Sequence, residues 1–379
     1  MTISLRATTP DFSAAIRCAT TACCSLLLFL LCASAQVSAQ HYQRTDLVSD
    51  VPGLAAATDA NLVNPWGLIS SPTSPWWVSD NGKGVSTLYN GAGAKQSLTV
   101  TVATPPGDPN PATPTGVVFN GSSDFQLVSG TPSTAARFIF VTEDGTVSGW
   151  NPSVAPTNSV LKVNNSGSAI YKGATIAQAG GINFLCVANF SNASVDVFDT
   201  NFMPMTQPAG AFVDPNLPEG FAPFNVENIG GKIYVAFAKQ DAEKHDEVAG
   251  RKFGFVDVFD GSGTLLQRFE NGPWMNAPWG LVVAPSHFGK ASGELLVGMF
   301  GSGQIATFDT ATGEFEGLLR DRHGKPIEID GLWALRFGNG AGAGPATTLF
   351  FTAGTDDEAH GLFGAITPIP KTDDEDDNM

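Results

Sequence analysis

The strongest constraint on this chain is a unit of about 55 residues that recurs along its length. Each unit holds short runs of Val, Ile, Leu and Phe, and each run is bounded by Gly, Ser, Asn, Asp or Pro. Such runs are typical of β-strands joined by tight turns. The third run of each unit ends on an aromatic residue followed by Asn or Asp, at Tyr89, Trp150, Phe198, Phe259 and Phe308. The chain is therefore expected to fold as a repeat array and not as several unrelated domains.

The other parts of the unit also recur. Residues 64–68 (NPWGL) and 277–281 (APWGL) nearly match, and residues 114–117, 223–226 and 330–333 are looser versions of the same opening. The second runs align at residues 76–80, 137–142, 183–189, 232–239, 294–300 and 348–354. These matches predict six units, which start near residues 64, 115, 171, 221, 277 and 330.

A fourth run follows in five of the units, at residues 97–102, 159–163, 210–213, 264–269 and 315–320. The sixth unit has no fourth run, whereas residues 45–49 form a strand that belongs to no unit. We therefore predict an all-β fold, a six-bladed β-propeller of four-stranded antiparallel blades over residues 40–368. The N-terminal strand would complete the last blade and pair both free edges. A sheet sandwich is the alternative, but it does not explain this circular arrangement.

Residues 1–39 differ from the rest of the chain. Arg6 and Arg17 precede the apolar run 25–35, and small residues follow it. This order predicts a secretory signal peptide, with the mature chain beginning near Gln36 or Gln40. An apolar run of about 11 residues is too short to span a bilayer, which needs about 20. We therefore expect export to the periplasm or the medium, and no membrane span in the mature chain.

Charge and cysteine content limit the partners. The net charge of −16 argues against nucleic acid and against anionic membrane surfaces. Cleavage at the predicted site leaves Cys186 as the single cysteine, inside an apolar run, so no disulfide is expected. The acidic tail 369–379 is expected to be disordered. We expect a monomer whose partner is a small molecule, a glycan or an envelope protein.

The NPWGL and APWGL openings, together with residues 187–199 (VANFSNASVDVFD), resemble an uncharacterised family of exported bacterial six-bladed β-propeller proteins. The resemblance covers residues 42–368. The Gly pairs at 180–181 and 230–231 are more distantly similar to NHL-type and surface-layer propeller repeats. The resemblance implies the fold and export, and it implies no particular activity.

Aromatic residues at the unit openings are candidate ligand contacts. In a propeller the opening strand is innermost, so Trp66, Trp279 and Trp333 would lie near the mouth of the central channel, with Asn64 and Asn276 beside them. Aromatic rings at a channel mouth can stack on sugars or cations. The alternative is that these rings wedge between the blades as ordinary core.

Oxygen-bearing side chains at the same openings suggest a cation site. Asn225, Glu227 and Asp330 are candidate metal ligands, because carboxylate and amide oxygens are ligands for Ca²⁺ or another divalent cation. The set looks like the Glu/Asn/Asn/Asp centre of lactonase-type propellers. The alternative is that these residues cap turns, as Asn and Asp often do.

Two loops that join second to third runs carry histidine among acids. The longer loop, residues 240–251 (QDAEKHDEVAGR), is the main candidate for a partner contact. The candidate residues in the two loops are Asp241, Glu243, His245, Asp246, Asp356 and His360. The alternative is a solvated acidic surface.

No nucleophile or cofactor motif is present. The sequence has no Gly-x-Ser-x-Gly, no His-Glu-x-x-His, no phosphate-binding loop and no Cys-x-x-Cys. We therefore expect a binding or scaffold module that uses the channel-mouth face. The alternative is a metal-dependent, lactonase- or hydrolase-like propeller enzyme with a cation at that mouth.

Overall fold

The computed structural model describes residues 41–128 and 134–370 of the 379-residue chain. The predicted signal peptide and the acidic tail from residue 371 lie outside the described residues. The chain divides into two units, Met1–Ala39 and Gln40–Met379, and the second unit holds all of the described residues. They form strands and two short 3-10 turns, η1 (Asn81–Lys83) and η2 (Gly289–Ala291). Within them, no helix has the length and apolar character needed to cross a membrane.

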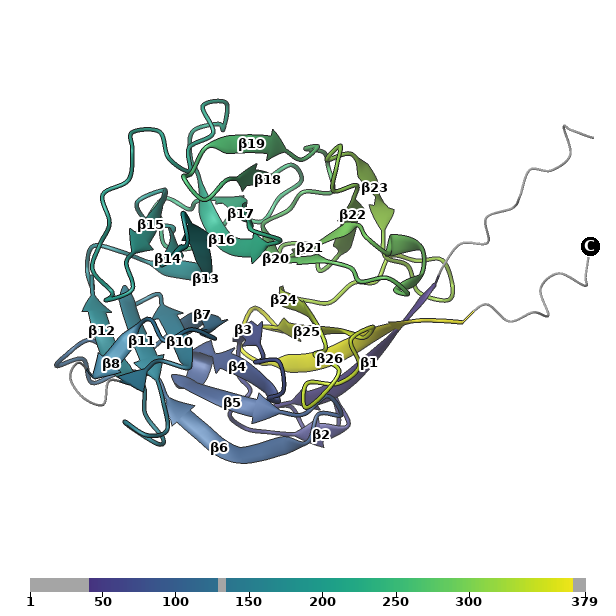
Figure 1. Ribbon diagram of the computed structural model, residues 1–379. Coiled ribbons are helices and arrows are strands. Elements are labelled where there is room, and N and C mark those ends of the chain that lie inside the picture. The colour runs from purple at the N-terminus through teal and green to yellow at the C-terminus, as the bar shows by residue number, and fades with distance from the viewer. Residues whose placement is uncertain (1–40, 129–133, 371–379) are drawn as a thin grey trace, which may run out of the picture. The chain divides into compact units, whose positions relative to one another are not determined.

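Six sheets, called blades 1 to 6, surround a common axis (Figure 1). Blade 1 holds β3 (Pro65–Ile69), β4 (Trp76–Asp80), β5 (Val85–Tyr89) and β6 (Lys95–Thr101). Blade 2 holds β7 (Pro114–Phe119), β10 (Phe138–Thr142), β11 (Thr146–Trp150) and β12 (Val160–Asn164). Blade 3 holds β13 (Tyr171–Ala179), β14 (Ile182–Asn189) and β15 (Ser194–Phe198). A separate hairpin, β8 (Gln126–Val128) with β9 (Thr134–Ala135), lies between the first two strands of blade 2 along the chain.

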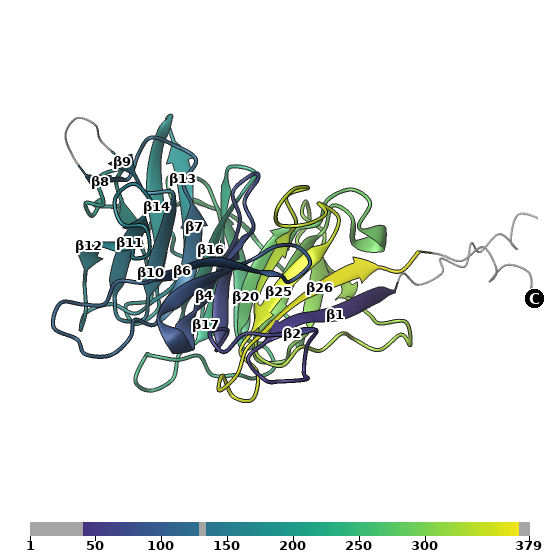
Figure 2. The same ribbon diagram turned by 90° about the horizontal axis from the view of Figure 1, so that it is seen from below.

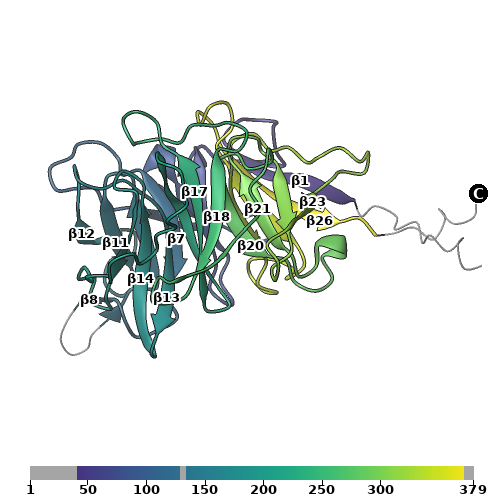
Figure 3. The same ribbon diagram turned by 90° about the horizontal axis from the view of Figure 1, so that it is seen from above.

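The second half of the chain repeats this pattern. Blade 4 holds β16 (Phe221–Ile229), β17 (Lys232–Lys239), β18 (Gly254–Phe259) and β19 (Leu265–Arg268). Blade 5 holds β20 (Pro278–Val283), β21 (Leu295–Met299), β22 (Ile305–Phe308) and β23 (Phe315–Leu318). Blade 6 holds β24 (Leu332–Phe337), β25 (Leu349–Ala353) and β26 (Leu362–Pro368), joined by β1 (Tyr42–Ser49) and β2 (Ala57–Thr58). Figure 3 shows β17 and β18 of blade 4 beside β20 and β21 of blade 5.

The first strands of the blades form the inner wall. Each of β3, β7, β13, β16, β20 and β24 contacts the first strand of the next blade, and β24 contacts β3. This closed circuit confirms the predicted six-bladed propeller. Apolar side chains from facing sheets fill the space between blades, as Ile139 and Val141 of blade 2 do with Leu185 and Val187 of blade 3.

The N-terminal strand closes the ring, as predicted. β1 pairs antiparallel with β26, from Tyr42 opposite Pro368 to Ser49 opposite Leu362. Figures 1 and 2 both show the purple β1 beside the yellow β26. The short β2 extends this sheet by pairing parallel with β1. The last blade is therefore built from both ends of the described chain, and β26 has no free edge.

Blade 3 differs from the prediction. The run at 210–213, predicted to be its fourth strand, forms a turn, and blade 3 has three strands. Pro204, Pro208, Pro215 and Pro218 flank the run, and proline cannot donate the backbone hydrogen bonds of a ladder. Phe212 instead packs on Phe259 of blade 4, with ring centroids 5.6 Å apart. This contact holds the segment that connects blade 3 to blade 4 against blade 4.

The glycine of both PWGL openings is required by the close approach of the inner strands. A Cβ atom on Gly67 would lie 2.5 Å from the Thr115 carbonyl oxygen, and one on Gly280 would lie 2.7 Å from the Trp333 carbonyl oxygen. These oxygens belong to the inner strand of the next blade, which cannot move away without breaking its own ladder. The glycine of the repeated motif is therefore explained by the short distance between neighbouring inner strands at this position.

Candidate functional site

Each inner strand carries one irregular position near its start, where the pairing register to the second strand shifts. Such a bulge re-aims the side chain of the extra residue. The residues at or beside the six irregularities are Trp66, Thr115, Lys172, Phe224, Trp279 and Trp333. Four of these six equivalent positions hold aromatic rings.

The four aromatic side chains meet inside the ring and form what we call the plug, Trp66, Phe224, Trp279 and Trp333. Trp66 stacks on Trp333 at 3.5 Å between centroids, and Trp279 meets both edge-on at about 6 Å. Phe224 contacts Trp66 and Trp333 from blade 4. The three tryptophans are 0–4% exposed. Their predicted role as accessible ligand contacts is therefore corrected, because the rings are buried against one another.

Lys172 occupies the plug position of blade 3. Its ammonium nitrogen lies 4.9 Å from the centre of the Trp66 ring and 5.7 Å from that of Phe190. Thr115 holds the position between blades 1 and 3, and its hydroxyl is bonded to the backbone carbonyls of Val141 and Tyr171. The lysine side chain is fully buried.

Carboxylates from three blades surround this ammonium. Lys172 pairs with Glu143 of the β10–β11 loop at 2.5 Å and with Asp246 of the β17–β18 loop at 3.1 Å. Glu247 and Glu358 complete the group through their charges. We call Lys172 and these four acids the mouth cluster. It lies on the mouth face, the face that carries the loops between second and third strands.

Two asparagines link the cluster to the plug. Asn64 donates from Nδ2 to Glu358 at 2.6 Å and accepts from the Trp333 indole N–H at 3.0 Å. Asn81 donates to Glu143 at 2.8 Å. Asn64 therefore lies between the plug and the mouth cluster. Its oxygen and nitrogen are engaged with the protein itself.

The mouth cluster titrates unusually. Burial lowers the pKa of Lys172, but the charges of Glu143, Glu247 and Asp246 outweigh it and raise that pKa above its ordinary value. Burial raises the pKa of Glu247 to about 8, against the opposing charge of Lys172. Burial likewise raises the pKa of Glu358 to about 7, although the Asn64 hydrogen bond opposes the shift. The lysine therefore stays charged, while two carboxyl groups exchange protons near neutral pH.

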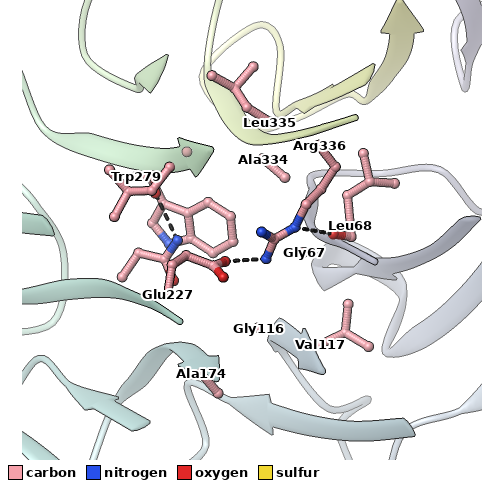
Figure 4. Close-up of a pocket in the computed structure, with 13 residues that line it drawn as sticks. Gly67, Leu68, Gly116, Val117, Ala174, Glu227, Trp279, Ala334, Leu335 and Arg336 are labelled. Carbon is pink, nitrogen blue, oxygen red and sulfur yellow. Dashed lines mark hydrogen bonds and ion pairs between the residues drawn. The ribbon is translucent and has the colours of Figure 1, made fainter. Parts of the chain in front are cut away.

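The predicted metal ligands do not come together. Glu227, near the end of β16, pairs with Arg336, near the end of β24, and Figure 4 shows this pair across a pocket. Asp330 precedes β24 on the mouth face, is exposed, and accepts a hydrogen bond from the Asp356 backbone N–H. At about 3.3 Å per residue, Asp330 and Arg336 are roughly 15–20 Å apart along the strand. Glu227 and Asp330 thus lie at opposite ends of the channel, which corrects the proposed set.

Asn225 is also engaged elsewhere. Its Nδ2 donates to the Trp279 carbonyl at 2.8 Å, and its Oδ1 accepts from the Val226 backbone N–H. Asn225 therefore bonds backbone groups, as expected if it has a structural role and is not a metal ligand. Arg336, which sequence reasoning missed, also donates to the Leu68 carbonyl at 3.1 Å. Burial raises the pKa of Glu227, and the Arg336 charge opposes that shift.

The loop candidates divide between two places. His245 bonds Asp246 at 2.9 Å, and ligand atoms of Glu143, His245 and Asp246 lie within 4.8 Å of one another, close enough to share a cation. Asp241 caps the same loop by accepting from the His245 N–H. Of the other candidates, Glu243 and Asp356 are exposed, and His360 pairs with Asp50 at 2.8 Å.

The predicted ligand contact Asn276 is bonded to the β17–β18 loop. Its backbone forms an isolated parallel β-bridge with Phe253, and its Oδ1 accepts a hydrogen bond from the Gly250 N–H at 2.6 Å.

The central residue that sequence reasoning missed is Lys172. The signal was present, because residues 171–174 (YKGA) align with PTGV at 114–117 and place a lysine where other openings have an aromatic ring.

Comparisons with known proteins give relatives and a fold. No protein-family model matches the chain. The uncharacterized protein R648 of Acanthamoeba polyphaga mimivirus is 32% identical over 332 residues, covering 84% of this chain and 78% of that protein. The mimivirus uncharacterized protein L690 is 32% identical over 336 residues, covering 84% of each. These relatives are viral, so they do not support the bacterial origin that the resemblance implied.

Two solved structures share the architecture. A streptogramin B lyase superposes with a TM-score of 0.50 at 10% identity, over 87% of this chain and 98% of the lyase. A protein of unknown function from Bacteroides thetaiotaomicron superposes with a TM-score of 0.53 at 12% identity, over 86% and 76%. At this identity the likeness concerns the fold alone.

Proposed function

We propose that this chain, which belongs to the same protein family as the mimivirus proteins R648 and L690, is a binding propeller that holds a divalent cation on its mouth face. The observation that carries the proposal is the charge of the mouth cluster. Four carboxyl groups surround one ammonium, and two of the four have pKa values raised to about 7 and 8. Burial is the main cause of both shifts, and a cation bound nearby would favour the ionised carboxylates and displace those protons.

The ligands would come from two loops. Glu143, His245 and Asp246 bring one nitrogen and two carboxylate oxygens within 4.8 Å of one another. A mixed imidazole and carboxylate set suits Mn²⁺ or Zn²⁺ better than Ca²⁺, which prefers a site made of oxygens alone. The bound ion would stand on the mouth face, where an anionic group of a small molecule, a glycan or a protein could complete its coordination.

Calorimetric titration tests this function. EDTA-treated protein is titrated with Mn²⁺, Zn²⁺ and Ca²⁺ at pH 7.5, in two buffers of different ionisation enthalpy. We expect saturable binding of at least one ion with net release of protons, because binding favours the ionised carboxyl groups. Glu143→Gln should weaken binding, whereas Glu243→Gln removes the same charge from an exposed position and should not. Absence of both binding heat and metal-dependent stabilisation would contradict the proposal.

A second candidate function rests on the same titrating groups. Glu358 could act as a general base near neutral pH, and the charged Lys172 could stabilise a developing anion, as a metal-dependent lactonase- or hydrolase-like enzyme requires. Because Lys172 is fully buried, substrate access would require the loops over the cluster to open. Metal-dependent turnover of simple lactones or esters that is lost in Glu358→Gln would favour this candidate over a binding role.

We also propose that the chain is exported and acts as a monomer. The support is the amino-acid pattern of residues 1–39, with two arginines, a short apolar run and small residues. Intact-mass measurement of protein from the medium or periplasm should show a start near Gln36 or Gln40. Retention of Met1 would contradict export, and a dimer mass by light scattering would contradict the monomer.

A further inference from the structure

A second pocket lies away from the plug, beside blade 5. Its volume is about 490 Å³, within the usual range for small-ligand pockets. It is lined by the outer strand β23, by Asn276 ahead of β20, and by Arg251 of the β17–β18 loop. The residues of the mouth cluster do not line it. We call it the blade-5 pocket.

The charge of this pocket is opposite to that of the chain. Arg251 and Arg320 line it, and none of its lining residues is acidic, although the net charge of the chain is −16. Arg251 has no hydrogen bond or ion pair within the described part of the chain. Arg320 uses one guanidinium nitrogen on the Gly324 carbonyl at 2.8 Å. The guanidinium groups therefore keep donors for an anion, and arginine pairs well with carboxylates.

The pocket also offers a ring surface and unused donors. Trp274 and Phe315 stack at 3.9 Å between centroids with 9° between their planes, and both line the pocket. The Trp274 indole N–H and the Ser302 hydroxyl are buried without a hydrogen-bond partner in the described residues. A buried donor left without a partner is costly, so a ligand that supplies acceptor oxygens would be favoured.

We infer that the blade-5 pocket binds a ring-bearing carboxylate. The arginines would take the carboxylate, the Trp274–Phe315 pair would contact the ring, and the unused donors would meet ring hydroxyl or carbonyl oxygens. Two sources share this chemistry: sugar acids such as glucuronate, and hydroxylated aromatic acids such as 4-hydroxybenzoate. This site is separate from the cation site proposed above and does not depend on it.

The test is calorimetric titration of the full mature chain with four probes. Glucuronate and 4-hydroxybenzoate are the acids, glucose is the neutral ring, and acetate is the anion without a ring. We expect saturable binding of one acid, at least about tenfold tighter than glucose or acetate, because hydrogen bonds to charged groups are the strong ones. The tighter of the two acids identifies the source. Binding of neither acid at millimolar concentration, or equal binding of all four probes, would overturn the inference.

Variants assign the binding to this pocket. Arg251→Gln/Arg320→Gln should weaken acid binding at least about tenfold. Arg322→Gln, which removes an exposed charge next to Asp321 and does not line the pocket, should leave it unchanged. Trp274→Phe keeps a ring but removes the unused N–H, and it should weaken binding severalfold. Unchanged affinity in the double arginine variant, with an unchanged melting temperature, would overturn the inference.

Discussion

The ammonium of Lys172 in blade 3 lies 4.9 Å above the indole of Trp66 in blade 1, on the inner side of the ring. This contact joins the apolar plug to the acidic mouth cluster, because the same ammonium pairs with Glu143 and Asp246. A buried charge is tolerated only where it is paired, and here two carboxylates pair with the ammonium. Lys172 therefore links the packing of the plug to the charge of the mouth face.

Replacing Lys172 tests this link. Lys172→Met should lower the free energy of unfolding by about 3–5 kcal/mol at pH 8, because it leaves the buried acids without their counter-charge. The loss should be smaller at pH 5, where Glu247 and Glu358, with pKa values of about 8 and 7, are neutral. Denaturant unfolding at both pH values measures the difference. Lys244→Met, an exposed change in the same face, is the control; equal losses for both would contradict the role of Lys172.

Asp257 should make stability fall as the pH rises. Burial raises the pKa of this carboxyl group to about 7, and its Oδ2 has no partner within the described residues. The folded state therefore binds this proton more tightly than the unfolded state, so stability decreases between about pH 4 and pH 7. Asp257→Asn should remove that decrease and gain roughly 2 kcal/mol at pH 8.

The control for Asp257 has the opposite sign. Hydrogen bonds from Ser262 and Thr264 lower the pKa of the exposed Asp260, so its contribution is present above its ordinary pKa and is lost on acidification. Asp260→Asn should therefore lower the melting temperature, relative to the unmodified protein, more at pH 8 than at pH 3. Parallel pH profiles for the two variants, measured by thermal melting, would contradict these opposite signs.

Ring closure can be tested by shortening the chain. A chain that begins at residue 51 lacks β1 and leaves the edge of β26 unpaired, whereas a chain that begins at residue 41 keeps it. The shorter chain should melt earlier and aggregate, because an unpaired strand edge recruits other chains. Melting temperature and light scattering compare the two. Equal behaviour would show that β1 is dispensable for closure.

Gly67 should not tolerate a side chain. Gly67→Ala should cost about 1–3 kcal/mol, because the added Cβ would lie 2.5 Å from the Thr115 carbonyl oxygen of the next inner strand. Gly121→Ala is the control, since its nearest neighbour is a Phe119 ring carbon at 3.2 Å, and a side chain can move. Denaturant unfolding of both variants measures the cost. A neutral Gly67→Ala would mean that the inner strands can separate.

Much of the fold could be predicted because strand patterns are local. The second strands of blades 1 and 4 have the expected bounds, Trp76–Asp80 and Lys232–Lys239. The missing fourth run and the unassigned N-terminal strand together predicted the closure. Blade 3 was predicted wrongly because the run at 210–213 is apolar like a strand, while its prolines and the contact of Phe212 with Phe259 draw it toward blade 4.

The amino-acid sequence by itself determined the number of blades, the strand order and the residues at the start of each inner strand, because repeats and apolar periodicity are readable without coordinates. Only the tertiary structure decided which of those residues meet. Glu227 and Asp330 occupy different heights along the axis, and Trp66, Trp279 and Trp333 turn inward onto one another. Lys172 pairs with Glu143 and Asp246, which lie in loops 29 and 74 residues away along the chain. Such contacts depend on strand register and ring diameter, which arise only when all six blades close together.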